Sequence, residues 1–118
     1  MSVDSILKQK SLDFAKRIVR LYQYLGKEHH EYVMSKQILR SGTSIGANIA
    51  EAIYGSSRKD FASKLQIAQK EAAETLDWLE LLNNCDYIPN NLYDSLNKDC
   101  RELLSILCSS IKSTENNT

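Results

Sequence analysis

The sequence has little proline, glycine, cysteine or histidine. Its 118 residues include one proline, four glycines, three cysteines and two histidines. An all-β chain needs many tight turns built on proline and glycine, so this composition favours helices. The three cysteines include no Cys-x-x-Cys pair. This argues against a disulfide framework or a zinc site and favours reduced thiols in the cytoplasm.

The chain also lacks a surplus of charge and any long apolar run. Fifteen basic and fifteen acidic side chains give a formal net charge of zero. Such a chain lacks the gross positive field of a dedicated nucleic-acid or anionic-lipid binder, so either partner would require a local basic surface. No apolar run approaches the roughly 20 residues that cross a bilayer, and the first residues form no secretory leader. We expect a cytoplasmic protein without a membrane partner.

Helical periodicity is present along nearly the whole chain. Apolar residues recur at spacings of three and four, which predicts helices over about 4–26, 32–54, 58–84 and 89–112. Gly26, Gly55 and Pro89 mark the connections, and Ser57 can cap the third helix. Four long helices with short connections predict an all-α, antiparallel up-down-up-down four-helix bundle, as a single domain over 1–118.

The predicted helix over 58–84 carries two apolar stripes. The first, expected to fill the core, contains Phe61, Leu65, Ala68, Ala72, Leu76, Leu79 and Leu82. The second, offset by about one residue, contains Ile67, Glu71, Glu74, Trp78, Leu81 and Cys85. A bundle helix needs only one apolar stripe, so the second predicts contact with a neighbouring subunit; the alternative is a wide core that covers both. Glu71 and Glu74 would then need a cation, for which Arg40 and Lys70 are candidates.

The predicted helix over 32–54 contains small residues at intervals of four, namely Gly42, Gly46 and Ala50. A glycine inside a helix costs about 1 kcal/mol relative to alanine, so some contact should offset it. The segment has neither the Lys-Ser/Thr of a P-loop nor the glycine pattern of a dinucleotide site. The small residues therefore predict a flat surface that lets a partner backbone approach closely.

Positive charge is concentrated in the first predicted helix, since residues 1–28 hold six basic and three acidic side chains. The candidates for binding nucleic acid are Lys10, Lys16, Arg17, Arg20 and Lys27, predicted to lie opposite the core residues Phe14, Ile18 and Leu25. Such a stripe can bind a phosphate backbone by counterion release. The alternative is a solvated helix face. No RNA-reading motif accompanies it, so any RNA binding would depend on shape and backbone.

Residues suited to catalysis are sparse. A di-iron bundle needs two Glu-x-x-His units, whereas Glu71-x-x-Glu74 is the nearest match and His29 and His30 lie in a predicted turn. No neighbouring base is available to activate Cys100. We therefore predict no enzymatic activity, no cofactor and no metal site.

Two blocks of the sequence carry a family resemblance. The first is Gln37-x-Leu39-Arg40-Ser41-Gly42-Thr43-Ser44-Ile45-Gly46-Ala47-Asn48-Ile49-Ala50-Glu51-Ala52, and the second holds Asp60-Phe61, Lys64-Leu65, Ile67-Ala68, Lys70-Glu71, Glu74-Thr75 and Trp78-Leu79-x-Leu81-Leu82. Together they resemble the four helix bundle protein family, also called intervening-sequence-encoded 23S rRNA-associated or ribosomal-protein-like proteins. The resemblance covers about 12–112 and implies an up-down bundle that assembles as a barrel-like homopentamer.

The family's name refers to reading frames within insertions in large-subunit ribosomal RNA genes, and it brings no catalytic residues. A related branch, the accessory variability protein of diversity-generating retroelements, is a strongly basic pentamer that binds nucleic acid and a reverse transcriptase; this neutral chain departs from it. We expect a non-enzymatic homo-oligomer that acts as a scaffold or as an accessory to ribosomal RNA or another nucleic acid. The alternatives are a protein–protein interaction module without nucleic-acid binding and, third, a bundle enzyme.

Overall fold

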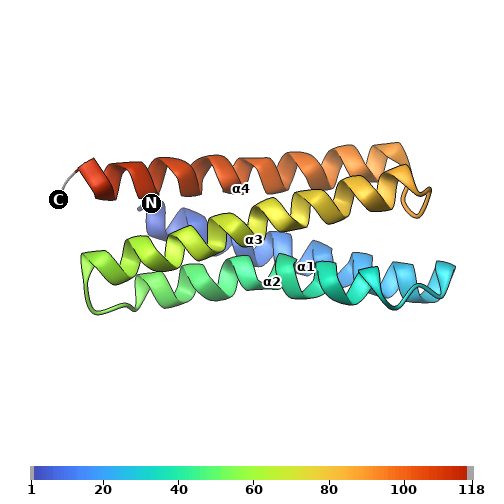
Figure 1. The fold of residues 1–118 in the computed structure, drawn as a ribbon, viewed down its shortest axis with the longest axis horizontal. Coiled ribbons are helices and arrows are strands. Elements are labelled where there is room, and N and C mark those ends of the chain that lie inside the picture. The colour runs from blue at the N-terminus through green and yellow to red at the C-terminus, as the bar shows by residue number, and fades with distance from the viewer. Residues whose placement is uncertain (1, 117–118) are drawn as a thin grey trace.

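The computed structural model describes residues 2–116, and Figure 1 shows four long helices in this part of the chain. They are α1 (Val3–His29), α2 (Met34–Ile53), α3 (Arg58–Asn84) and α4 (Asn90–Asn116). The described residues form no strand, so the predicted all-α four-helix bundle is confirmed. The chain turns back at each short connection, and α1 begins at the end of the bundle where α4 finishes (Figure 1). The bundle measures 47 × 22 × 21 Å.

The start of α3 follows the sequence prediction, whereas the end of α1 does not. Ser57 caps α3, because its hydroxyl accepts a 3.1 Å hydrogen bond from the backbone N–H of Asp60. Helix α1 continues past Gly26 to His29. It ends where His30 adopts a left-handed conformation with φ 50°, and the N–H of the next residue donates to the carbonyl of Leu25 at 3.1 Å.

The bounds of α2 and α4 differ from the predicted bounds by a few residues. At the start of α2 the difference has a local cause. The carboxylate of Glu31 accepts hydrogen bonds from the backbone N–H groups of Val33, Met34 and Ser35, so α2 begins at Met34 rather than at 32. Helix α4 begins at Asn90 and continues to Asn116, beyond the predicted end at 112.

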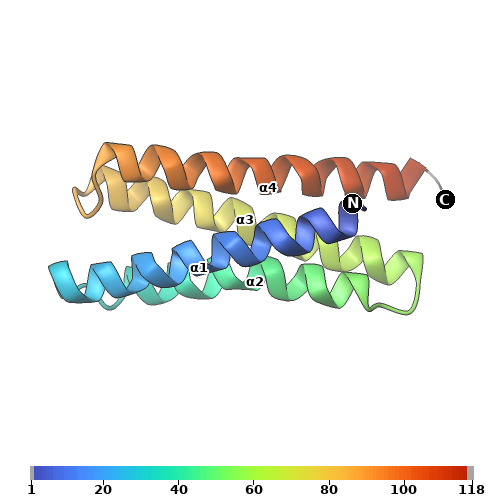
Figure 2. The ribbon, with the colours of Figure 1, turned by 180° about the vertical axis from the view of Figure 1, so that it is seen from behind.

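The core is a continuous column of apolar side chains from all four helices. Its largest fully buried members include Leu7, Phe14, Ile18, Leu25, Ile38, Ile45, Ile49, Leu65, Leu79, Leu82, Leu96 and Leu103. Contacts join α1 to α2, α2 to α3 and α3 to α4, and the contact between α1 and α4 is the smallest among these neighbouring pairs. Figure 2 shows α1 crossing the bundle obliquely in front of α2. None of the helices in the described part of the chain is long and apolar enough to cross a bilayer.

Helix α2 lies close to both of its neighbours because it presents small residues to them. A Cβ atom on Gly42 would lie 2.8 Å from the side chain of Ile18, and one on Gly46 would lie 3.3 Å from the hydroxyl of Ser11. On the side toward α3, the buried hydroxyls of Ser41 and Thr75 are 2.9 Å apart. The small residues of α2 thus face α1 and α3 within the same chain.

This close packing predicts that Gly42→Ala destabilises the protein although alanine favours the helix. Overpacking costs roughly 1–3 kcal/mol, and the gain in helix propensity is about 1 kcal/mol. We expect a net loss in the free energy of unfolding, measured by urea denaturation, and a smaller effect for Gly46→Ala. Ala73→Gly, at an exposed position inside α3 that lies outside both of its stripes, calibrates the helix propensity. A Gly42→Ala protein as stable as the parent would contradict the packing described here.

Candidate functional site

The second stripe of α3 contains a charged cluster that reaches across to α2. The guanidinium of Arg40 donates to the carboxylate of Glu71 at 2.9 Å and also pairs with Glu74. The indole N–H of Trp78 donates to the same Glu74 carboxylate at 3.1 Å. Of the two candidate cations, Arg40 therefore holds both glutamates, while Lys70 forms no ion pair within residues 2–116.

This cluster is electrostatically unbalanced, since one guanidinium serves two carboxylates. The hydrogen bond from Trp78, followed by that from Arg40, lowers the pKa of Glu74 below its ordinary value. The hydrogen bond to Glu74, with a smaller contribution from Glu71, raises the pKa of Arg40. Taken as a unit at neutral pH, the three charged side chains carry one negative charge in excess.

Apolar side chains of the same stripe remain uncovered on either side of the cluster. Ile67 is 39% exposed and Leu81 is 42% exposed, whereas Trp78 is half-buried and packs against the core. Within one chain, the alternative of a wide core therefore accounts for Trp78 but not for Ile67 or Leu81. The two exposed side chains lie about 21 Å apart along α3, at roughly 1.5 Å of rise per residue, with the charged cluster between them.

The five basic residues of α1 that are candidates for binding nucleic acid divide into two groups, which the sequence pattern did not separate. Lys10 pairs with Glu102 of α4, and Arg17 pairs with Asp99 of α4 at 2.7 Å. The other three, Lys16, Arg20 and Lys27, are exposed and have no carboxylate partner among residues 2–116. Two of the five candidate positive charges are thus neutralised by α4.

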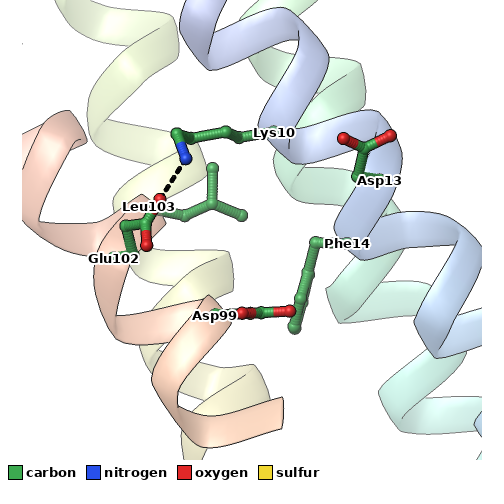
Figure 3. Close-up of a pocket in the computed structure, with 6 residues that line it drawn as sticks. All are labelled: Lys10, Asp13, Phe14, Asp99, Glu102 and Leu103. Carbon is green, nitrogen blue, oxygen red and sulfur yellow. Dashed lines mark hydrogen bonds and ion pairs between the residues drawn. The ribbon is translucent and has the colours of Figure 1, made fainter. Parts of the chain in front are cut away.

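The ion pair of Lys10 lies beside a cavity of about 210 Å³ between α1 and α4 (Figure 3). In Figure 3, Lys10 reaches from α1 toward Glu102, and Phe14 and Leu103 extend into the space between the two helices. Asp13, which completes the acidic lining with Asp99, accepts a 2.9 Å hydrogen bond from Gln9. Glu102 raises the pKa of Lys10, which keeps the amine protonated and unsuited to act as a base. Two ion pairs beside this cavity, Lys10 with Glu102 and Arg17 with Asp99, therefore connect α1 and α4.

The thiols and the histidine rings have different kinds of surroundings. Burial raises the pKa of the Cys100 thiol to about 12, so it is not an activated nucleophile. Cys85 and Cys108 are free and exposed. His29 packs edge-on between the rings of Tyr24 and Tyr87. Among the described residues, no group of three or more His, Cys, Asp or Glu side chains could hold a metal ion.

The sequence profile of one family, 23S rRNA-intervening sequence protein, matches residues 3–109. The chain belongs to this family. A crystal structure of a protein of unknown function from the S23 ribosomal protein family of Bacteroides thetaiotaomicron is 57% identical to it, with a TM-score of 0.92 over 94% of this chain and 99% of that chain. The resemblance drawn from the two sequence blocks is thereby confirmed. No curated protein matches the chain.

One apolar surface was not singled out from the sequence. Leu12 is 50% exposed and Val19 is 39% exposed on α1. The signal that could have found them is the one that revealed the second stripe of α3, namely apolar residues seven positions apart and offset by one from the core residues.

The lowered pKa of Glu74 predicts a pH-dependent contribution to stability. Because the folded-state pKa lies below the ordinary value of 4.5, the ionised carboxylate stabilises the protein above about pH 4.5, and this stabilisation is lost as the pH falls through the folded-state pKa. We expect the protein to exceed Glu74→Gln in free energy of unfolding at pH 7 and the difference to shrink below pH 4.5. Urea denaturation monitored through the single tryptophan measures it. A pH-independent difference would contradict this role.

Proposed function

We propose that this chain is the protomer of a non-enzymatic homo-oligomer that acts as a scaffold in the cytoplasm. The second stripe of α3 carries this proposal, because Ile67 and Leu81 are exposed on either side of the cluster formed by Arg40, Glu71 and Glu74. A tryptophan beside an apolar surface of this kind is a common anchor of protein interfaces. The family resemblance favours five antiparallel bundles arranged as a barrel.

The charged groups of the cavity between α1 and α4 support a non-enzymatic role. Asp99 and Glu102 are held in ion pairs, and Asp13 is held in a hydrogen bond. The buried Cys100 thiol, whose pKa is raised to about 12, is not an activated nucleophile either.

The proposal predicts that the purified protein is several times heavier than its 13.4 kDa chain. Light scattering coupled to gel filtration at micromolar concentration should give five times this mass. Ile67→Glu/Leu81→Glu should lower the mass, because assembly would bury unpaired carboxylates. Trp78→Glu should do the same, although its half-buried position also threatens the fold, so circular dichroism must accompany it.

The matched control is Lys98→Glu, which changes the net charge by the same two units at an exposed position of α4. It should leave the mass unchanged. A parent protein that elutes as a single chain would contradict the homo-oligomer, and an unchanged mass for Ile67→Glu/Leu81→Glu would remove this stripe from the interface.

A second function, association with ribosomal RNA or another nucleic acid, is favoured by one observation. Lys16, Arg20 and Lys27 project from α1 without carboxylate partners within residues 2–116. In an oligomer this group would be repeated in each copy, and such an array binds phosphates by releasing counterions. We propose these three residues, rather than Lys10 and Arg17, as the primary contacts.

This second proposal predicts salt-dependent binding that depends on α1. Arg20→Glu/Lys27→Glu should weaken binding of a structured RNA, measured by fluorescence anisotropy at two salt concentrations, and should flatten its salt dependence. Lys98→Glu/Lys112→Glu on α4 is the charge-matched control. Equal binding by both variants, or no binding by the parent at low salt, would contradict it.

A further inference from the structure

The gap between α1 and α4 holds a second cavity, beyond the one beside Lys10. Helix α1 starts next to α4 and diverges from it along its length (Figure 1 and Figure 2). The ion pair between Arg17 and Asp99 crosses this gap. On the far side of Arg17, a cavity of about 240 Å³ opens to solvent. We call it the Arg20 cavity, after the one exposed residue of its lining.

Most of the lining of the Arg20 cavity is apolar. Leu21 and Tyr24 come from α1, and Leu92 and Leu96 come from α4. Leu21 and Leu96 are buried, while Tyr24 and Leu92 are half-buried and pack against the core. An apolar cavity of about 150 Å³ inside a protein binds benzene. The larger volume of the Arg20 cavity therefore has room for one aromatic ring with a short side chain.

The charge at the border of this cavity is positive. Arg17 and Arg20 complete the lining, three positions apart and thus neighbours on one face of α1, and none of the carboxylates in residues 2–116 lines it. Arg17 donates to Asp99 at 2.7 Å, which compensates its charge. Arg20 has no carboxylate partner in the same part of the chain. One positive charge therefore remains uncompensated beside an apolar space.

Tyr24 adds an aromatic side chain to this space. Its ring packs edge-on against that of His29, with centroids 5.6 Å apart, and this contact restrains the tyrosine ring. Aromatic rings attract each other at centroid separations of about 4.5–7 Å. A ring bound between the leucines of α1 and α4 would gain such a contact with Tyr24.

These features favour a ligand with one negative charge and one apolar end. A guanidinium binds a carboxylate through two parallel N–H donors, which fixes both position and orientation. A dianion would leave one charge without a partner next to the leucines, at a cost in desolvation. A ligand without an apolar part would leave the leucine wall in contact with water.

We propose that the Arg20 cavity binds a small monocarboxylate that carries one apolar ring. The carboxylate binds Arg20, and the ring lies against Leu21, Leu92 and Leu96. This site requires neither assembly nor nucleic acid. Among the three residues proposed as the primary contacts to nucleic acid, only Arg20 lines the cavity, so variants of the others separate the two proposals.

Three probes test the chemistry of the ligand: phenylacetate, phenylethanol and acetate. Each is titrated to millimolar concentration into the full chain, and the leucine methyl signals are followed by NMR. Phenylacetate should shift the signals of Leu21, Leu92 and Leu96 and reach saturation. Phenylethanol has no charge and acetate has no ring, so each should bind at least about tenfold more weakly. No saturable shift with phenylacetate, or equal binding of either other probe, would overturn the proposal.

Three variants test the location of the site. Arg20→Gln should weaken phenylacetate binding about tenfold, because it removes the charged hydrogen bond. Leu92→Trp should abolish binding, because the indole would fill the cavity, and circular dichroism verifies its fold. Lys16→Gln removes the same charge from an exposed position of α1 outside the cavity and should leave binding unchanged. Parent-like binding by Arg20→Gln, or equal weakening by Lys16→Gln, would overturn the site.

Discussion

A helix in a four-helix bundle can bury only one stripe of its surface against its neighbours, and the rest of this molecule depends on that limit. Helices α1 and α3 carry apolar residues beyond the stripe they bury. In α3 the surplus is Ile67 and Leu81, and in α1 it is Leu12 and Val19. Because other side chains already fill the core of one chain, these exposed groups must contact either solvent or another chain.

Helix α2 packs against both of the helices that carry these exposed apolar residues, α1 and α3. Its glycines allow Ile18 and Ser11 of α1 to approach closely, and Ser41 contacts Thr75 of α3 at 2.9 Å. Arg40 of the same helix holds Glu71 and Glu74. The residues that join α2 to its neighbours therefore also position the outer surfaces of α1 and α3, which in the proposed oligomer would contact other chains.

Local chemistry made part of this structure predictable. The bounds of α3 and its Ser57 cap follow from residues adjacent in sequence, and Arg40 was a candidate partner because a glutamate in an apolar stripe needs a cation. The end of α1 was misplaced because Gly26 is a common stop signal, whereas the left-handed residue is His30. Arg17 and Asp99 are 82 positions apart in the sequence. Their pairing depends on how α1 packs against α4, which the periodicity within one helix does not specify.

The central claim, that the exposed surfaces of α1, α2 and α3 are covered by further copies of the chain, is tested most directly by small-angle X-ray scattering over a range of concentrations. A single chain has a Cα radius of gyration of 14.7 Å. The account predicts a radius of gyration well above this value and forward scattering that corresponds to five copies. A radius near 14.7 Å, with the forward scattering of one 13.4 kDa chain at every concentration, would contradict it.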